Sequence, residues 1–320
     1  MPSEFVLIDR YFRRPTGHTQ LGVGDDGALI RATPGTELVA STDMLVSGTH
    51  FLPDTDPEAL GWKVLAVNVS DMAAMGAEPR WALLAAALPA ATESWIERFA
   101  AGFFACASAH GVDVIGGDTT RGPRNFCVTI LGEVPQGQAL LRSGARAGDE
   151  VWVSGTPGLA ALGLAHLQGR CVLADDVRDR CVGALQRPQP RVALGIALRG
   201  LATAAIDVSD GLLGDLGHIL DDSGVGAELS LEAMPGAALA AAGDAELGRR
   251  CLLAGGDDYE LVLTAPAGMA ARIESLSSQI GLALTRIGTV VAEHPSRSIV
   301  RDARGRVCDV GQAGYDHFAS

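Results

Sequence analysis

The chain has 320 residues, of which 48% are hydrophobic and 20% are charged, and its formal net charge is −13. This length exceeds that of a typical single domain, so we expect two domains with sizeable cores. An acidic surface repels nucleic acid and anionic membranes, so neither is expected as a partner. Residues 1–14 lack the apolar core of a signal peptide, and no apolar run reaches the ~18 residues of a membrane span. We therefore expect a cytoplasmic protein.

The basic residues and the cysteines restrict the possible chemistry. Lys63 is the only lysine, so the chain has no P-loop, a motif that requires a lysine after its glycines. Phosphate groups would have to be bound by arginine, backbone N–H groups and metal ions. The six cysteines form no C-x-x-C pair and lack zinc-ligand spacing with histidine, which favours reduced, mostly buried thiols.

The first half of the chain is predicted to alternate strands and helices. The Asp56-Pro57 pair is typical of a helix start, with aspartate as N-cap and proline at the first helical position. Thr92 is a second expected N-cap, and Gly111 should follow the end of its helix. In chain order, the predicted elements are a strand at 20–30, a strand at 38–47, a helix from 57 to about 76, a strand at 81–88, a helix at 93–109, a strand at 112–115 and a strand at 126–134.

The chain becomes polar between residues 135 and 148, and we place the domain boundary there, with domains at 1–138 and 139–320. The elements predicted after it are a strand at 150–154, a helix within 155–167, a strand at 204–208, a helix capped by Ser209 that ends near 220, a strand at 259–264, a helix at 269–280 and one or two last strands. Long strands mixed with packing helices indicate an α/β or α+β fold. The Gly155–Gly158 turn could bind phosphate, but a plain tight turn fits better because Pro157 removes one N–H donor.

Aspartates beside glycine, serine or threonine recur near the predicted strand ends. They occur in Gly24-Asp25-Asp26, Ser41-Thr42-Asp43, Gly116-Gly117-Asp118, Asp207-Val208-Ser209-Asp210-Gly211 and Gly256-Asp257-Asp258. Each motif alone also fits an ordinary turn. Converging carboxylates would repel one another unless cations neutralise them, and Mg²⁺ is the natural candidate because it takes oxygen ligands and substrate phosphates.

Asp71 differs from the others because it lies on an otherwise apolar helix. Asn68 and Asp71 are three residues apart and therefore share one helix face. Asp71 is also near the helix C-terminus, where the helix dipole disfavours an anion. A structural hydrogen bond and a metal ligand both remain open for this carboxylate.

Taken together, these motifs closely resemble the thiamine-monophosphate kinase family, within the aminoimidazole ribonucleotide synthetase-like superfamily. The resemblance spans nearly the whole chain and includes the run Gly116–Gly122 and the closing Gly314–Phe318. It implies a two-domain fold whose N-terminal domain, 1–138, binds ATP and Mg²⁺ and pairs its sheet with that of a second subunit to form a barrel. The C-terminal α/β domain, 139–320, packs beside it, and the protein is a homodimer.

The resemblance also assigns roles to individual residues. The metal ligands implied for several Mg²⁺ ions are Asp26, Asp43, Asp71, Asp118, Asp207 and Asp210, assisted by Ser41 and Thr42. The implied ATP contacts are Gly117, Asp118, Arg142 and Ser209. The implied contacts to thiamine monophosphate are His50, Asp258 and Tyr315. Judged alone, His50 could be a surface histidine and Tyr315 a simple packing residue.

The activity implied is a metal-assisted, in-line transfer of the ATP γ-phosphoryl group to thiamine monophosphate. The acceptor phosphate is already largely dianionic at neutral pH, so no side chain is expected to act as a catalytic base or nucleophile. Two alternatives are another ATP-dependent synthetase of the superfamily and a non-catalytic nucleotide- or metal-binding protein. The N-terminus lacks the Cys and Lys of selenophosphate synthetases, and the chain ends in Phe318-Ala319-Ser320 without the C-terminal Cys of hydrogenase maturation proteins.

Overall fold

The computed structural model describes residues 4–309 and 314–315. Asp316, His317 and Phe318 of the closing motif lie outside the described residues. The chain forms two compact units, residues 1–72 with 77–137 (unit 1) and residues 73–76 with 138–320 (unit 2). The expected mixed α/β fold with two domains is confirmed. No helix in the described part of the chain is long and apolar enough to cross a membrane.

Unit 1 contains a four-stranded sheet in the order β3-β6-β4-β5, in which only β4 and β5 are parallel. The elements of this unit begin with the helical turns α1 (Glu4–Leu7) and η1 (Ile8–Phe12) and the strands β1 (Thr19–Leu21), β2 (Leu29–Ile30) and β3 (Thr36–Val46). They continue with α2 (Pro57–Ala74, whose last two residues belong to unit 2), β4 (Glu78–Leu88), α3 (Glu93–His110), β5 (Asp113–Arg121) and β6 (Asn125–Pro135).

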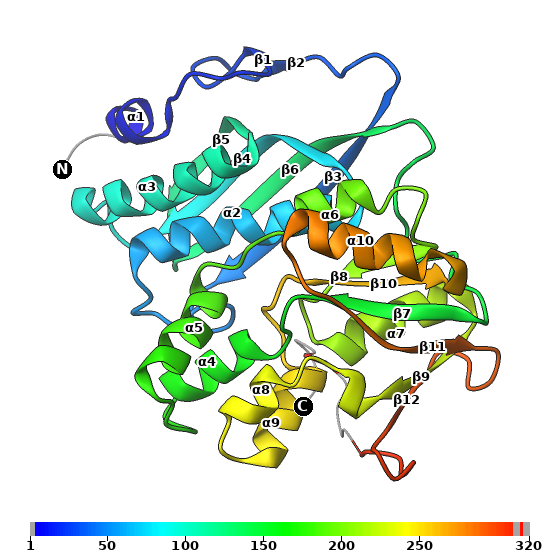
Figure 1. Cartoon of the computed structure of the whole chain (residues 1–320). Coiled ribbons are helices and arrows are strands. Elements are labelled where there is room, and N and C mark those ends of the chain that lie inside the picture. The colour runs from blue at the N-terminus through cyan, green and yellow to red at the C-terminus, as the bar shows by residue number, and fades with distance from the viewer. Residues whose placement is uncertain (1–3, 310–313, 316–320) are drawn as a thin grey trace. The chain divides into compact units, whose positions relative to one another are not determined.

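Helix α3 packs on one face of this sheet (Figure 1). The ring of Phe99 stacks on that of Phe126 from β6, with 4.6 Å between centroids, and Trp95 stacks on both. Phe99 and Phe126 are each only 1% exposed. The opposite face carries Leu38, 49% exposed, and Met44, 55% exposed. The sheet of one chain is therefore covered on one side, and within the described residues it is open and forms no closed barrel.

Unit 2 is built on a six-stranded sheet in the order β12-β9-β11-β7-β10-β8, in which only β12 and β9 are parallel. Its strands are β7 (Asp149–Ser154), β8 (Ala204–Asp207), β9 (Gly226–Ser230), β10 (Leu261–Pro266), β11 (Leu284–Val291) and β12 (Ser298–Arg301). Its helices are α4 (Leu159–Leu167), α5 (Asp175–Gln186), α6 (Val192–Ala197), α7 (Leu212–Ser223), η2 (Leu231–Ala233), α8 (Ala237–Ala241), α9 (Ala245–Ala254), η3 (Ala267–Met269) and α10 (Ala270–Ile280).

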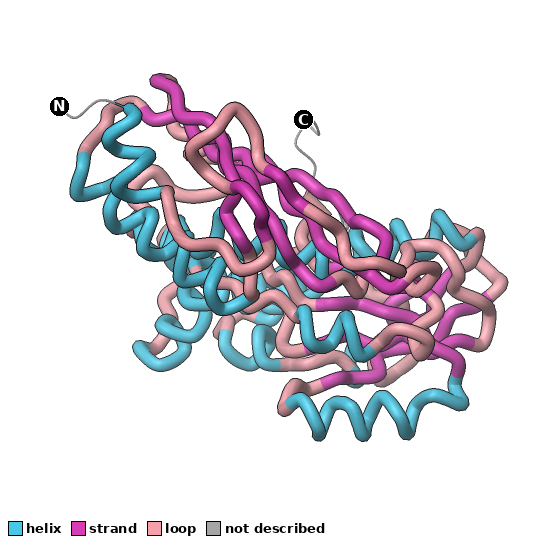
Figure 2. Tube along the Cα trace, turned by 90° about the horizontal axis from the view of Figure 1, so that it is seen from above, coloured by secondary structure: helices cyan, strands magenta, loops and turns pink. Residues whose placement is uncertain are grey.

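Helices cover both faces of this second sheet. One apolar cluster joins α7 and α9 to the face that carries Val151 and Ile206, and another joins α6 and α10 to the face that carries Trp152. Every residue of β7 is buried, as expected for a strand with apolar layers on both sides. Figure 2 shows the chain turned by 90° from the view of Figure 1, with helices and strands in different colours.

Three predicted elements are wrong in their limits. The strand expected at 20–30 is two short antiparallel strands, β1 and β2, and Asp26 lies in the turn between them. The strand expected to end at Ile115 continues as β5 to Arg121, so Gly117 and Asp118 lie within a strand. Helix α7 has Gly211 as N-cap in place of Ser209.

The predicted caps have different outcomes. Asp56 accepts hydrogen bonds from the N–H groups of Glu58 (3.0 Å) and Ala59 (3.1 Å), which confirms it as an N-cap. Thr92 occupies the cap position of α3, but its side chain makes no capping hydrogen bond. Gly111 ends this helix at φ 65°, as predicted.

Candidate active site

In unit 1, the edge strand β3 and helix α2 bring three of the predicted metal ligands together. The hydroxyl of Ser41 donates to Oδ2 of Asp71 at 2.6 Å. The N–H of Asp43 donates to Oδ1 of Asn68 at 3.1 Å, and Asn68 is fully buried. Because residues two apart on a strand share a face, Ser41 and Asp43 both lie on the side of β3 that faces α2. This geometry places two carboxylates and a hydroxyl, all hard oxygen donors, beside one another.

Thr42 and Asp118 lie on the other face of the same sheet. The Thr42 hydroxyl donates to the carbonyl of Val128 at 2.9 Å. The strand register aligns Met44, Cys127, Ala85 and Asp118 in one row across the sheet, and residues directly opposite in a ladder share a face. Asp118 therefore shares the open face with Met44 and is not brought to Asp43 within one chain.

Gly117 occupies a backbone position that excludes any side chain. Its φ is 150°, and an added Cβ would lie 1.8 Å from the carbonyl oxygen of Leu84 on the neighbouring strand. Glycine at position 117 is thus required for β5 to pair closely with β4. Asp26, in contrast, is exposed in its turn, and its N–H donates to Asp25 at 2.9 Å.

His50 lies in the turn that follows β3. Its Nδ1 accepts the N–H of Val46 at 2.9 Å, so the neutral imidazole carries its proton on Nε2. The ammonium group of Lys63 lies 3.4 Å from the His50 carbonyl oxygen, and Lys63 is only 3% exposed. The single lysine of the chain therefore lies next to a predicted substrate residue, a placement that the sequence motifs did not indicate.

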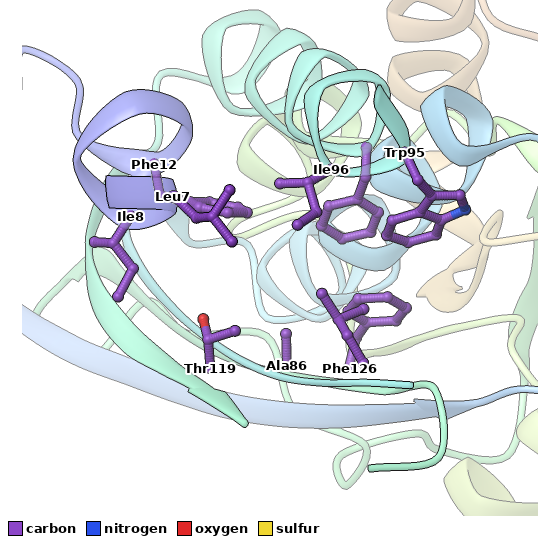
Figure 3. Close-up of a pocket in the computed structure, with 10 residues that line it drawn as sticks. Leu7, Ile8, Phe12, Ala86, Trp95, Ile96, Thr119 and Phe126 are labelled. Carbon is purple, nitrogen blue, oxygen red and sulfur yellow. The ribbon is translucent and has the colours of Figure 1, made fainter. Parts of the chain in front are cut away.

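A small cavity of about 20 Å³ in unit 1 is unsuited to phosphate. It lies between the N-terminal helical turns, α3 and the sheet (Figure 3), and its lining includes Leu7, Phe12, Ile96 and Phe126. Among its lining residues only Thr119 carries a hydroxyl, and none is charged. An apolar cavity of this size stays dry, so it belongs to the core of unit 1.

In unit 2, the 207–211 loop connects β8 to α7, and its backbone is hydrogen-bonded on both sides. The carbonyl groups of Val208 and Ser209 accept the N–H groups of Tyr259 and Asp257, both at 2.8 Å. The N–H groups of residues 209–211 all donate to Oδ2 of Asp215, each at 3.0 Å. The structure thereby joins the predicted metal segment to the segment that carries the predicted substrate residue Asp258.

Asp215 was not among the predicted site residues, although it lies close to two of them. It is 2% exposed, and burial, together with the carboxylates of Asp207 and Asp210, raises its pKa to about 8. Three carboxylates thus lie near one another at the start of α7. A cation on this loop would offset their mutual repulsion.

Asp258 has a clear structural function at the start of α4. Its two carboxylate oxygens accept the N–H groups of Gly158 (2.6 Å) and Ala160 (3.2 Å). Burial raises its pKa well above the usual range, and the nearby Glu260 and Asp257 act in the same direction. In the Gly155–Gly158 turn, the Gly158 N–H therefore binds the chain's own carboxylate and the Gly155 N–H donates to the carbonyl of Ala283, which agrees with the plain-turn interpretation.

The other predicted contacts in unit 2 are more exposed. The N–H of Tyr315 donates to the carbonyl of Asp210 at 3.0 Å, and 55% of Tyr315 is exposed. This hydrogen bond places the tyrosine directly beside the 207–211 loop. Arg142 is exposed in the segment before β7, where a guanidinium group can reach an anion in solvent.

A partly buried ion pair fixes the segment that carries Asp258. Arg191 donates to both carboxylate oxygens of Glu260, at 2.7 and 2.6 Å, and Ser154 donates to the same carboxylate at 2.6 Å. Glu260 is 5% exposed. Such a pair contributes little to the free energy of unfolding when it is intact. Removing one partner is costly, because it leaves the other charge buried without compensation.

Replacing Arg191 with methionine is therefore expected to lower the free energy of unfolding by about 3 kcal/mol, measured by urea denaturation. Arg178→Met is the matched control, because Arg178 pairs with Asp175 and Asp179 at the surface and should contribute below about 1 kcal/mol. Equal, small losses in both variants would contradict a structural role for the Arg191–Glu260 pair.

Within the described residues, no three His, Cys, Asp or Glu side chains form a ready-made metal cluster. This arrangement differs from a structural zinc site, in which four protein ligands enclose the ion. It is compatible with Mg²⁺, which is often held by one or two carboxylates together with waters and substrate phosphates. The donors described above are carboxylates and a hydroxyl, the oxygen ligands that Mg²⁺ prefers.

Comparison with known proteins gives a consistent result over the whole chain. The model of the AIR synthase related protein N-terminal domain matches residues 24–134, and that of the C-terminal domain matches residues 146–301. The thiamine-monophosphate kinase of Escherichia coli (strain K12) is 45% identical over 323 residues, which cover 99% of each chain.

Solved structures show the same similarity. The crystal structure of thiamine-monophosphate kinase from Stenotrophomonas maltophilia K279a superposes with a TM-score of 0.85 at 44% identity, covering 96% of this chain and 98% of that one. AaThiL complexed with AMPPCP and TMP has a TM-score of 0.77 at 32% identity, with 92% of each chain covered.

Proposed function

The chain belongs to the thiamine-monophosphate kinase family, and we propose that it transfers the γ-phosphoryl group of ATP to thiamine monophosphate, giving thiamine diphosphate and ADP. The observation that carries this proposal is the full-length match to thiamine-monophosphate kinases. A relative with bound AMPPCP and TMP supports the pair of substrates. The six free cysteines are in keeping with a protein that works in the cytoplasm.

We propose that the metal ligands are oxygen donors in both units. Those in unit 1 are Asp26, Ser41, Thr42, Asp43, Asp71 and Asp118, and those in unit 2 are Asp207 and Asp210. The contact between Ser41 and Asp71 supports this set, because it brings a hydroxyl and a carboxylate together. Bound Mg²⁺ would neutralise phosphate oxygens and stabilise the charge that spreads over the transferring group.

The proposed ATP contacts are Gly117, Asp118, Arg142 and Ser209, and the proposed substrate contacts are His50, Asp258 and Tyr315. His50 can donate a hydrogen bond from Nε2, because Nδ1 is already an acceptor. The exposed ring of Tyr315 can cover a cationic heterocycle. Asp258 also holds the start of α4 through Gly158 and Ala160.

Phosphoryl transfer in this protein requires no protein nucleophile. The attacking atom is an oxygen of the acceptor phosphate, whose second pKa of about 6 leaves it largely dianionic at neutral pH. The aspartates therefore bind and position, and proton removal from the acceptor is not needed. The protein's contribution is alignment of the two anions and compensation of their charge.

We further propose that the active protein is a homodimer in which two sheets of unit 1 close into a barrel. The open face with Leu38 and Met44 exposed supports such a contact, since apolar side chains of this kind are typical of interfaces. Asp43 and Asp118 lie on strands at opposite edges of one sheet, three strand spacings or about 14 Å apart. A barrel that joins β3 of one chain to β5 of its partner would place the strand of one chain's Asp43 directly beside the strand of the partner's Asp118.

The proposed reaction is tested by measuring ADP release with Mg-ATP and thiamine monophosphate, beside controls with thiamine and with an aminoimidazole ribonucleotide precursor. Turnover is expected only with thiamine monophosphate and should be abolished by EDTA, because the carboxylates cannot compensate phosphate charge without a cation. Turnover with the precursor alone would assign the chain to a sister synthetase. Clean ATP binding without turnover would indicate a non-catalytic binding protein.

A further inference from the structure

Asp215 gathers three consecutive backbone N–H groups onto one oxygen atom. The donors belong to Ser209, Asp210 and Gly211, and each N···Oδ2 distance is 3.0 Å. Converging N–H groups of this kind form a concave anion site, called a nest. In this structure the nest is filled by the carboxyl group of Asp215, from the first turn of α7.

Gly211, the last residue of the loop and the N-cap of α7, contributes no side chain that could hold the shape of the nest. Its φ is 131°, and an added Cβ would lie 2.8 Å from the backbone of Ala254. The N–H groups of residues 209–211 precede the first helical residue, Leu212, and Asp215, a residue of the first turn that is 2% exposed, supplies their acceptor.

Opposite sides of the loop backbone are engaged in different ways. The carbonyl groups of residues 208–210 accept N–H groups from Tyr259, Asp257 and Tyr315, whereas the N–H groups of residues 209–211 donate to Asp215. A phosphate group of a ligand therefore cannot use these N–H donors while Asp215 occupies them. The loop is left to interact with ligands through side chains, among them the carboxylates of Asp207 and Asp210.

We propose that Asp215 is a positioning residue for the phosphoryl transfer. By filling the nest of the 207–211 loop, it orients Asp207 and Asp210 to bind cations and prevents the loop from binding a phosphate directly through its backbone. The proposal rests on the function proposed above, and specifically on the assignment of Asp207 and Asp210 as metal ligands. A residue that supports metal ligands in this way changes metal affinity or activity by about 10–100-fold when it is removed.

The test compares Asp215→Ala and Asp215→Asn with the wild-type protein. Asp215→Ala is expected to raise the half-saturating Mg²⁺ concentration for ADP formation by about 10–100-fold, with a far smaller change in the KM for thiamine monophosphate. The half-saturating Mg²⁺ concentration of Asp215→Asn should lie between that of the wild type and that of Asp215→Ala, because the amide oxygen of asparagine can still accept some of the N–H groups. Asp222→Asn is the matched control, since Asp222 is an exposed residue of the same helix, and it should match the wild type.

A second measurement tests the positioning function of Asp215 independently of the proposed phosphorylation of thiamine monophosphate. Binding of Mn²⁺ in the presence of AMPPCP, followed by electron paramagnetic resonance, should weaken in the order wild type, Asp215→Asn, Asp215→Ala. A wild-type protein that binds Mn²⁺ and AMPPCP but does not phosphorylate thiamine monophosphate would overturn the proposed reaction and leave this order to be judged on its own. A wild type that binds no Mn²⁺ would overturn the positioning proposal itself.

Three further outcomes decide against the proposal. Unchanged Mg²⁺ dependence in both Asp215 variants would show that the loop keeps its shape without the carboxylate. Complete loss of Mn²⁺ binding in Asp215→Asn, as severe as in Asp210→Asn, would make Asp215 a direct ligand. If Asp215→Ala does not fold, as judged by circular dichroism, Asp215→Asn decides alone, and an unchanged half-saturating Mg²⁺ concentration in this variant overturns the proposal.

Discussion

Asp71→Asn is expected to lower kcat by about 10²–10³-fold while leaving the fold intact. Asparagine has nearly the same shape and can still accept the hydrogen bond from Ser41, so the contact between β3 and α2 should persist. The variant removes the negative charge, however, and with it the attraction for a cation near the acceptor and ATP phosphates. Steady-state ADP formation at saturating Mg²⁺ measures the effect, and thermal unfolding verifies the fold.

The matched control for this variant is Asp54→Asn. Asp54 lies in the same unit, in the connection between β3 and α2, and is exposed. The same loss of charge should leave its kcat near that of the wild type. Turnover of Asp71→Asn close to that of the control would rule out Asp71 as a metal ligand and leave it with a structural hydrogen bond to Ser41.

The arrangement around Asp71 shows what helix periodicity can predict. A spacing of three residues places Asn68 and Asp71 on one helix face, and in the structure both reach β3, through Asp43 and Ser41 respectively. The sequence therefore indicated a polar face on an otherwise apolar helix. It could not indicate the strand that this face meets, because that depends on the packing of the sheet.

The two wrong predictions about aspartates have opposite causes. Glycine beside aspartate usually marks a turn, and this rule predicted a strand end at Gly116-Gly117-Asp118. Gly117 instead lies inside β5, where the close approach of Leu84 requires a residue without a side chain. The prediction also kept Asp26 in a strand, whereas the glycines around it form the turn between β1 and β2.

Helix α5 and the function of Asp215 could not be predicted for other reasons. Helix α5 is mostly polar and buries only Cys181 and Leu185, so its periodic apolar signal is weak. Asp215 carries no motif of its own, since its importance depends on three backbone N–H groups of the preceding loop. Only the folded backbone shows that these donors converge on one carboxylate oxygen.

The largest recovery of activity is expected from mixing two inactive variants, Asp43→Asn and Asp118→Asn. Alone, each should lose about 10²–10³-fold in kcat, because every site in a homodimer lacks one carboxylate. In the proposed dimer a site takes Asp43 from one chain and Asp118 from its partner. A heterodimer then contains one intact and one doubly altered site, and about half of the wild-type activity should return.

The experiment uses two affinity tags, co-expression and purification of the heterodimer, followed by ADP release with thiamine monophosphate. The control heterodimer combines Asp43→Asn with Asp71→Asn, and it should remain inactive. Both of these residues lie at the contact of β3 with α2 in one chain, so each site of that heterodimer lacks one of them.

The geometry of one chain makes this test decisive. Within one chain, Asp43 faces α2 and Asp118 faces the open side of the sheet, and their strands lie about 14 Å apart. Two carboxylates that share one Mg²⁺ each lie about 2.1 Å from the ion, so Asp43 and Asp118 of the same chain are too far apart to share one. Recovery in the first heterodimer and none in the control would therefore assign Asp118 to the partner's site. No recovery in either would mean that each chain builds its sites alone, and that Asp43 and Asp118 bind different ions.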